Sequence, residues 1–136
     1  MSEPADRYFA AAEGQPQGPG RYVNVDADVA PVELVAGLIF RPVVGADVMA
    51  TFVRFEPHTE APTHAHAEEQ FTIVLDGELE FVLDGETRVL RAGDVAVVPP
   101  FVPHGARTRD SHSDEIDVFC PPRQALLQHL RDQPAE

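Results

Sequence analysis

Short runs of β-branched and aromatic residues, interrupted by glycine, proline and aspartate, fill most of this chain. Such residues favour extended backbone and the interruptions are typical of turns, so we expect a strand in each run. The expected strands cover residues 32–40, 48–56, 70–75, 78–83, 87–90 and 95–98. Asp-Gly pairs between consecutive runs predict tight hairpins, and the connections are too short for crossover helices. The sheets are therefore expected to be antiparallel.

The polarity of the two faces differs from strand to strand. In residues 78–83, leucine and phenylalanine alternate with a more polar set, which indicates one buried face. In residues 70–75 both faces are largely uncharged, so we expect a pocket on one side and a second layer or a subunit interface on the other. A helical period is found only in residues 123–130. The patterns predict an all-β sandwich or small barrel with a short C-terminal helix.

The length and the N-terminal composition give the expected domain organisation. The 136 residues suit one domain with its own core. Glycine and proline cluster in residues 14–20, so we expect residues 1–20 to form a flexible arm and residues 21–136 a single domain. The chain starts without a signal-peptide pattern, has no apolar run of membrane-spanning length, and has a lone Cys120. We expect a cytoplasmic protein.

The charge balance narrows the choice of partners. The formal net charge is −13, with 23 acidic residues against 10 basic ones, all of them arginine. Such a field repels phosphate backbones and anionic lipids, so we expect neither nucleic acid nor membrane as a partner. A small-molecule substrate is expected instead. The absence of lysine excludes a Schiff-base mechanism on a lysine.

Histidines supply the candidate chemistry. His64 and His66 are spaced i, i+2, and Gln70 has the same parity, so on an extended segment all three point to one side. A metal needs donors from several directions, and His104 is the expected donor from another strand. Four neutral nitrogen and oxygen donors predict one divalent transition metal, either zinc, nickel, iron or manganese.

Other polar residues compete for places in this site. Parity disfavours Glu69 and favours Glu68 as a replacement for Gln70, but Glu68 has the wrong spacing to the turn at Gly77. His58 and His112 have no spacing that relates them to the cluster, so they are expected to be solvated loop residues. A site of four histidines that uses His58 stays open.

Two ordered motifs resemble those of the cupins. They are His64-x-His66-x3-Gln70-x6-Gly77 and Gly93-x5-Pro99-x4-His104, and the match covers about residues 45–123. The resemblance implies a cupin jelly-roll barrel, or double-stranded β-helix, that holds a divalent metal. The sequence departs from the family pattern where it has His58, Gln70, Phe101 and Thr108. Gln70 stands where most cupins have glutamate, which leaves a bound ion more Lewis-acidic toward an anionic substrate.

A second group of candidate residues follows His104. Asp117 and Phe119 alternate with Ile116 and Val118, so they share one face of a strand. Asp117 either pairs with Arg123 in a structural ion pair or acts beside the metal as a general acid or base.

This segment, together with Gln70, is similar to the cupins of pectin and alginate breakdown that convert unsaturated monouronates to linear keto forms. The similarity implies that His64, His66, Gln70 and His104 hold the metal. It also implies that Asp117 moves a proton, Arg123 pairs with the substrate carboxylate and Phe119 shapes the wall of the site.

Three other functions stay open. A dioxygenase would need iron or copper and would consume oxygen. A polyketide-cyclase-like cupin would need a larger apolar pocket, with the candidate lining residues Phe52, Phe55, Phe81 and Phe101. The third is a non-catalytic binding or sensing module.

We also expect a homodimer that covers strand 70–75, with the arm around residues 22–25 exchanged between the subunits.

Overall fold

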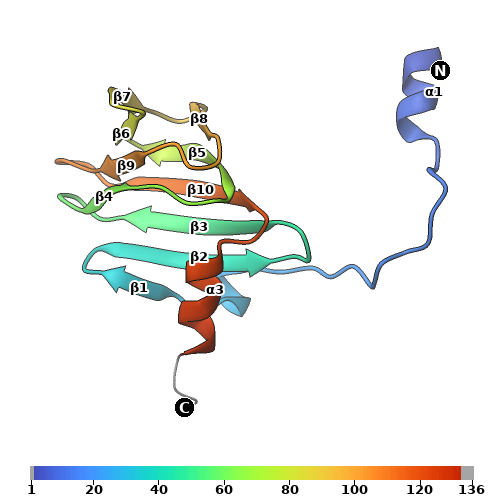
Figure 1. Cartoon of the computed structure of the whole chain (residues 1–136), viewed down its shortest axis with the longest axis horizontal. Helices are drawn as coiled ribbons and strands as arrows, with labels where there is room; N and C mark the ends of the chain where they lie inside the picture. The colour runs from blue at the N-terminus through green and yellow to red at the C-terminus, as the bar shows by residue number, and fades with distance from the viewer. Residues whose placement is uncertain (1, 133–136) are drawn as a thin grey trace.

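Two antiparallel sheets form the body of the protein in a computed structural model, which describes residues 2–132 (Figure 1). The larger sheet has the order β1 (Val32–Val35), β2 (Leu38–Val44), β3 (Met49–Phe55), β10 (Ser113–Cys120), β5 (Glu69–Gly77) and β8 (Val95–Val98). The smaller sheet has the order β4 (Glu60–His64), β9 (His104–Arg107), β6 (Leu79–Leu83) and β7 (Glu86–Leu90). This is the cupin jelly-roll expected from the sequence.

The helices are short and lie outside the sheets. Helix α3 (Gln124–Arg131) follows β10 after three residues, and its Leu126 and Leu127 belong to the same apolar cluster as Val44 of β2. It confirms the helical period found near the C-terminus (Figure 1). Helices α1 (Glu3–Phe9) and α2 (Val25–Asp28) belong to the N-terminal segment. The boundaries of arm and domain at residues 20 and 21 stay predictions.

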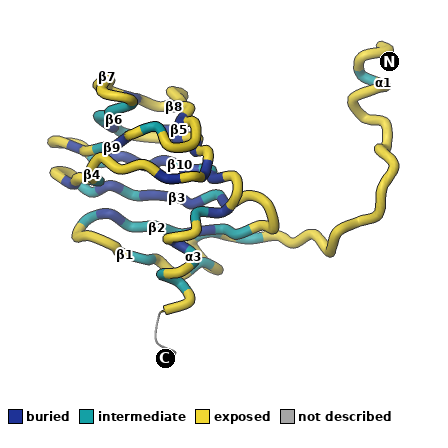
Figure 2. Tube along the Cα trace, in the orientation of Figure 1, coloured by how far each residue is buried: buried dark blue, intermediate teal, exposed yellow. Residues whose placement is uncertain are grey.

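The core lies between the two sheets. Alternate residues of β3 and β10 point inward, so buried and half-buried positions alternate along both strands (Figure 2). Side chains from the two sheets meet in one apolar cluster. Its buried members are Leu38, Val53, Phe55, Val74, Leu79, Phe81, Leu90, Ala96 and Val98. The alternation predicted for residues 78–83 is thus confirmed by the burial of Leu79 and Phe81.

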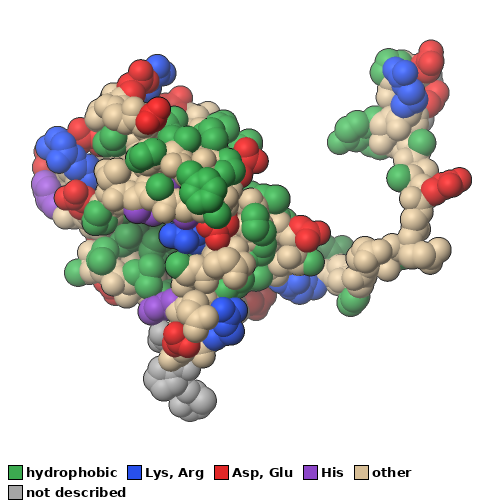
Figure 3. All heavy atoms as spheres, in the orientation of Figure 1, with side chains coloured by type: hydrophobic (Ala, Val, Ile, Leu, Met, Phe, Trp, Pro, Cys, Tyr) green, Lys and Arg blue, Asp and Glu red, His purple; other side chains and the backbone are tan. Residues whose placement is uncertain are grey.

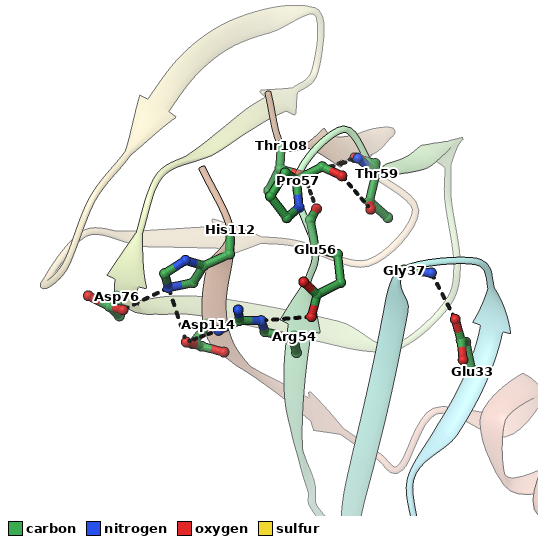
Figure 4. Close-up of polar contacts among 10 residues, drawn as sticks. All are labelled: Glu33, Gly37, Arg54, Glu56, Pro57, Thr59, Asp76, Thr108, His112 and Asp114. Atoms are coloured by element: carbon green, nitrogen blue, oxygen red, sulfur yellow. Dashed lines mark hydrogen bonds and ion pairs between the residues drawn. The ribbon is translucent and has the colours of Figure 1, made fainter. Parts of the chain in front are cut away.

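One expected strand is wrong. Residues 32–40 form two strands, β1 and β2, because the chain turns between Val35 and Leu38. Gly37 allows this turn through its φ of +85°, and its N–H donates to the Glu33 side chain at 2.9 Å (Figure 4). Pro42 follows the expected strand 32–40 but does not end it, because it lies within β2. Its position is beyond the residues of β2 that pair with β1, so its missing N–H costs no hydrogen bond to β1.

The outer face of strand β5 is open in the single chain. Gln70, Thr72 and Val74 are buried, whereas Phe71 and Leu75 on the opposite face are 40% and 48% exposed. Within residues 2–132, no second layer of the chain covers Phe71 and Leu75, so the expectation of a second layer over this strand is wrong. The other cover, a subunit interface, stays a prediction.

The N-terminal segment reaches away from the body (Figure 1). Residues 2–22 are almost entirely exposed (Figure 2). Hydrophobic side chains stand out from this segment (Figure 3). Tyr8, Phe9 and Tyr22 are 81%, 72% and 105% exposed. One hydrogen bond from the Arg21 guanidinium to the Val44 carbonyl, at 2.6 Å, ties its end to β2.

Candidate metal centre

Three imidazoles converge between the two sheets. His64 ends β4, His66 follows it in the connection to β5, and His104 begins β9. The ring centroids of His104 lie 4.5 Å from those of His64 and 4.8 Å from those of His66. One ring nitrogen of each residue lies within 4.8 Å of the others, close enough to hold one metal ion.

The route by which these residues meet differs from the one expected. We predicted that His64, His66 and Gln70 lie along one extended segment, but β4 ends at His64 and β5 begins at Glu69. The chain crosses from the smaller sheet to the larger one between them. The residues therefore face each other from two sheets, so their convergence comes from the crossing and not from strand parity.

The backbone fixes the orientation of each imidazole. The Nδ1 atoms of His64, His66 and His104 lie 2.8, 3.0 and 2.9 Å from the carbonyl oxygens of Pro62, Glu68 and Val102. A carbonyl oxygen can only accept, so each Nδ1 carries the hydrogen. Each neutral ring then keeps its lone pair on Nε2, which is how a histidine binds a metal.

Gln70 completes the donor set. Its Oε1 lies 3.1 Å from Nε2 of His66 and 3.1 Å from Nε2 of His104. Its amide nitrogen donates to Thr72 Oγ1 at 2.8 Å and faces Asp117 Oδ1 at 3.4 Å, which fixes the oxygen toward the histidines.

The Nε2 atoms of His66 and His104 and the Oε1 atom of Gln70 cannot hydrogen-bond to each other, because none of them carries a hydrogen. Burial lowers the pKa of His104 to about 4 and also lowers that of His66, so both rings are neutral near pH 7. Two nitrogen lone pairs then face one amide oxygen at hydrogen-bonding distance. A cation at their common centre resolves this arrangement, so His64, His66, Gln70 and His104 fit a divalent metal.

The competing residues do not join the donor set, although Glu68 Oε1 lies 3.4 Å from Nδ1 of His66. His58 has a φ of +57° and pairs with Asp110 at 3.3 Å on the surface, outside the histidine cluster. Glu68 is buried, but its Oε2 accepts the Gln124 N–H at 2.8 Å and its Oε1 lies 3.7 Å from Arg123. Glu68 therefore holds the start of α3.

Asp117 lies next to the donor set, on the inner face of β10. Thr72 Oγ1 donates to its Oδ1 at 2.8 Å. Burial raises the pKa of Asp117 to about 6, although hydrogen bonds, first that from Thr72, offset part of the effect. A carboxyl group with this pKa can accept and release a proton near neutrality.

Arg123 does not pair with Asp117. Its guanidinium lies beside Glu68 instead, which contradicts the structural ion pair considered from the sequence. Arg123 and Phe119 both line the same cavity as Asp117. The His66 and Phe119 rings meet edge to face with centroids 5.7 Å apart. Phe119 is thus held in place by contact with the donor set, whereas Arg123 is held by Glu68.

Sequence reasoning missed Glu115. It is 3% exposed and lies two residues before Asp117 on the inner face of β10. Burial first, and then the neighbouring Asp117, raise the pKa of Glu115 well above its usual range. The parity that placed Asp117 and Phe119 inward applies equally to Glu115, so the signal was present in the sequence.

The site opens into a cavity of about 370 Å³. One end carries His64, Gln70, His104, Asp117 and Arg123, and the remainder is mainly apolar. Of the aromatic residues proposed for an apolar pocket, Phe55 and Phe81 line this cavity. Phe52 lies on the opposite face of β3, and Phe101 is 71% exposed, so these two predictions are wrong.

A second cluster lies at the opposite end of β10 (Figure 4). His112 Nε2 lies 2.8 Å from Asp76 and 3.5 Å from Asp114, and Arg54 donates to Asp114 at 3.0 Å. These groups are close enough to hold a cation. They already pair with each other at the surface, so they form an ion-pair network.

Residues 51–115 match the family model of the cupin domain. Together with the two-sheet fold and the histidine cluster, this match shows that the chain has the cupin fold and is similar to the cupin family. No helix in the described part of the chain is both long and apolar enough to cross a membrane.

Two solved structures resemble most of the chain. An RmlC-like cupin from Shewanella frigidimarina has 29% sequence identity and a TM-score of 0.73, over 82% of this chain and 99% of that one. KdgF from a Halomonas species has 29% identity and a TM-score of 0.72, over 80% of this chain and 99% of that one.

A curated relative matches part of the chain. The H2HPP isomerase of Bacillus subtilis is 38% identical over 74 residues, which cover 53% of this chain. The chain spans 30% of the length of that relative.

Proposed function

We propose that this protein is a metal-dependent isomerase of an unsaturated, uronate-like sugar acid, which it converts to the linear keto form. The observation that carries the proposal is the position of Asp117, a buried carboxyl group with a pKa of about 6, directly beside the donor set. The resemblance to the uronate-linearising cupins supports it, as does the similarity of most of the chain to KdgF.

The reaction moves a proton within one molecule. The anomeric hydroxyl loses its proton as the bond between the anomeric carbon and the ring oxygen breaks, which forms an aldehyde and an enolate. The enolate becomes a ketone when the neighbouring carbon gains that same proton. No net oxidation occurs, so one group that takes and returns a proton is sufficient.

The residues of the cavity have separate roles in this scheme. A divalent metal held by His64, His66, Gln70 and His104 would polarise the oxygens of the substrate. Asp117 takes the proton of the hydroxyl and delivers it to carbon. Arg123 pairs with the substrate carboxylate, for which a planar guanidinium is well matched. Phe119 forms the wall against the ring.

The test is a turnover assay on metal-loaded protein with a 4,5-unsaturated galacturonate monomer. Ultraviolet absorbance of the conjugated double bond falls as the ketone forms. We expect Asp117→Asn to keep its metal but to lose about 10²- to 10⁴-fold in rate. An unchanged rate in this variant, or no absorbance loss with the wild type, would contradict the proposal.

A second candidate is the isomerisation of a more apolar cyclic acid. The mainly apolar cavity favours it, with Leu38, Phe40, Phe55 and Phe81 in the lining. Similarity to the H2HPP isomerase also favours it. Faster turnover of an unsaturated carbocyclic acid than of the uronate would select this candidate. Oxygen uptake during turnover would instead indicate a dioxygenase, and ligand binding without turnover a sensing module.

We also propose a homodimer formed on the open face of the larger sheet. Phe71, Leu75, Val95 and Val97 are 40–48% exposed on neighbouring strands there. The N-terminal segment exposes aromatic side chains that a second copy could cover. Sedimentation of Val97→Asp should show a monomer, whereas Val89→Asp, at an equally exposed valine on β7, should stay dimeric. A monomeric wild type would contradict the proposal.

The cytoplasmic location stays a prediction.

A further inference from the structure

Two buried carboxyl groups lie side by side on the inner face of β10. Glu115 and Asp117 are two residues apart on this strand, so their side chains point to the same face. They are 3% and 7% exposed. The Glu115 carboxyl is hydrogen-bonded to the Asp117 carboxyl. A carboxylate oxygen only accepts, so a bond between two carboxyl groups requires that one of them carries a proton.

The donors around the two groups decide which of them carries this proton. Asp117 Oδ1 accepts the Thr72 hydroxyl at 2.8 Å and faces the Gln70 amide nitrogen at 3.4 Å. Such donors stabilise the ionised form of a carboxyl group. Glu115 Oε2 accepts no hydrogen bond from an N–H or hydroxyl group of residues 2–132. The negative charge therefore belongs to Asp117 and the proton to Glu115.

The strands beside Glu115 offer nothing that would hold a negative charge there. Its neighbours on β3 and β5 are Val53 and Val74, which are 3% and 1% exposed. In the described part of the chain, Asp117 is the one charged group that acts on Glu115. A second carboxylate at this place would be both desolvated and repelled by the first. Glu115 therefore stays neutral when Asp117 ionises.

We propose that Glu115 is a positioning residue, which keeps its proton and donates a hydrogen bond that holds the Asp117 carboxylate in place beside the metal centre. Three donors then converge on Asp117, from Thr72, Gln70 and Glu115. Hydrogen bonds to a charged acceptor are stronger than those between neutral groups, so together they restrict the rotation of the carboxylate. Glu115 itself needs no contact with the substrate. The effect of this hydrogen bond on turnover rests on the proposed function.

Infrared spectroscopy of the metal-loaded protein tests the hydrogen bond without turnover. Ordinary carboxyl groups are ionised at about pH 8, so a carboxyl that stays protonated gives a carbonyl band of its own. We expect this band in the wild type and its loss in Glu115→Gln. Asp117→Asn should keep the band but shift it to higher frequency, because the acceptor changes from a carboxylate to a neutral amide.

Asp114→Asn is the matched control for the spectrum. Asp114 precedes Glu115 on β10, but its carboxylate pairs with Arg54 at 3.0 Å on the other face of the strand. The band should stay unchanged in this variant.

Turnover of the 4,5-unsaturated galacturonate measures the positioning itself. Glu115→Leu should lower kcat about 10- to 100-fold, the factor that one hydrogen bond to a charged group provides, and leave KM within about threefold. Glu115→Gln keeps an N–H donor, so its kcat should stay within about threefold of the wild-type value. Both variants should keep their metal. Equal kcat values for Glu115→Leu and Glu115→Gln would contradict the positioning role.

The spectrum and the turnover separate this proposal from the proposed function. No carbonyl band in the wild type, a band that persists in Glu115→Gln, or a band that Asp117→Asn leaves unshifted would overturn the proposal. These spectra decide the question even if Glu115→Leu fails to fold. A wild type that shows the band and its shift but converts no uronate would refute the proposed reaction and leave the hydrogen bond from Glu115 to Asp117 intact.

Discussion

Two clusters of possible metal ligands lie in this molecule, and they differ in how their lone pairs are used. In the histidine centre, every Nδ1 is held by a backbone carbonyl two residues away, so each Nε2 lone pair is left for another partner. In the cluster of Asp76, His112 and Asp114, the His112 Nε2 already meets two carboxylates. Proximity of ligating residues alone therefore does not define a metal site.

The two clusters also differ in burial. His66 and His104 are 8% and 2% exposed, whereas the side chains of Asp76 and Asp114 are 70% and 37% exposed. Water screens the charges of the second cluster, so its ion pairs need no metal and contribute little to stability. The first cluster has no such alternative partner for its lone pairs. Preoriented acceptors, two of them on the buried rings of His66 and His104 and one on the exposed ring of His64, thus distinguish the candidate metal centre from a surface network.

The largest effect should come from removing an imidazole. His104→Ala should lower the affinity for the metal by more than the roughly 100-fold that loss of a supporting partner costs, because a direct ligand is lost. His112→Ala should leave the metal content unchanged. Elemental analysis after gel filtration measures both. Equal metal loss in the two variants would remove the distinction between the clusters.

A smaller effect is expected from exchanging the amide donor for a carboxylate. Gln70→Glu removes the N–H groups that face Thr72 and Asp117 and brings a further carboxylate to Asp117, which already neighbours Glu115. We expect the metal-free variant to lose roughly 1–3 kcal/mol of unfolding free energy.

Urea titration of the metal-free protein measures this loss. Asp114→Asn, an equal change of one charge in the surface cluster, should cost no more than about 1 kcal/mol. A metal-free Gln70→Glu variant as stable as the wild type would show that the amide is not needed to hold Asp117.

The smallest effect is a pH dependence of opposite sign in the two clusters. The folded-state pKa of Asp117, about 6, lies above its ordinary value of 3.8. Its contribution to stability is present below pH 3.8 and is lost as the pH rises through 6. The hydrogen bond from His112 lowers the pKa of Asp76, so that contribution is present above pH 3.8 and is lost at lower pH.

Melting temperatures of the metal-free protein between about pH 2 and pH 8 measure this difference. Asp117→Asn should become more stable than the wild type as the pH rises, by on the order of 5 °C at pH 8. Asp76→Asn should be slightly less stable than the wild type at pH 8 and should match it near the acid end. Parallel curves for all three proteins would contradict the assigned pKa shifts.

Much of the fold follows from short-range patterns. The Asp-Gly pairs and the alternation around Leu79 and Phe81 predict hairpins with one buried face, and β8 begins and ends where it is expected. The exception is the turn at Gly37. The turn was missed because apolar residues continue on both sides of Gly37, although those of β1 before the turn are mostly exposed and those of β2 after it are buried or half-buried.

Only part of the candidate metal centre could be predicted from the sequence. The two motifs indicate which residue types meet, and alternation along β10 places Asp117 and Phe119 inward. The contacts of Glu68 with Arg123 and with the start of α3 could not be predicted, because α3 returns to the sheet only in the folded chain. Glu115 was missed although its parity was plain, because a buried carboxyl attracts attention only once its surroundings are known.

The sequence by itself determined most of the strands, the buried face of residues 78–83 and the set of residues able to bind a metal, since these depend on spacing along a few consecutive residues. Only the tertiary structure decided that the donors meet across two sheets, that Nε2 is the nitrogen each ring offers, and that Glu115 lies buried beside Asp117. These properties depend on pairing between strands far apart in the chain, and on the burial that such pairing creates.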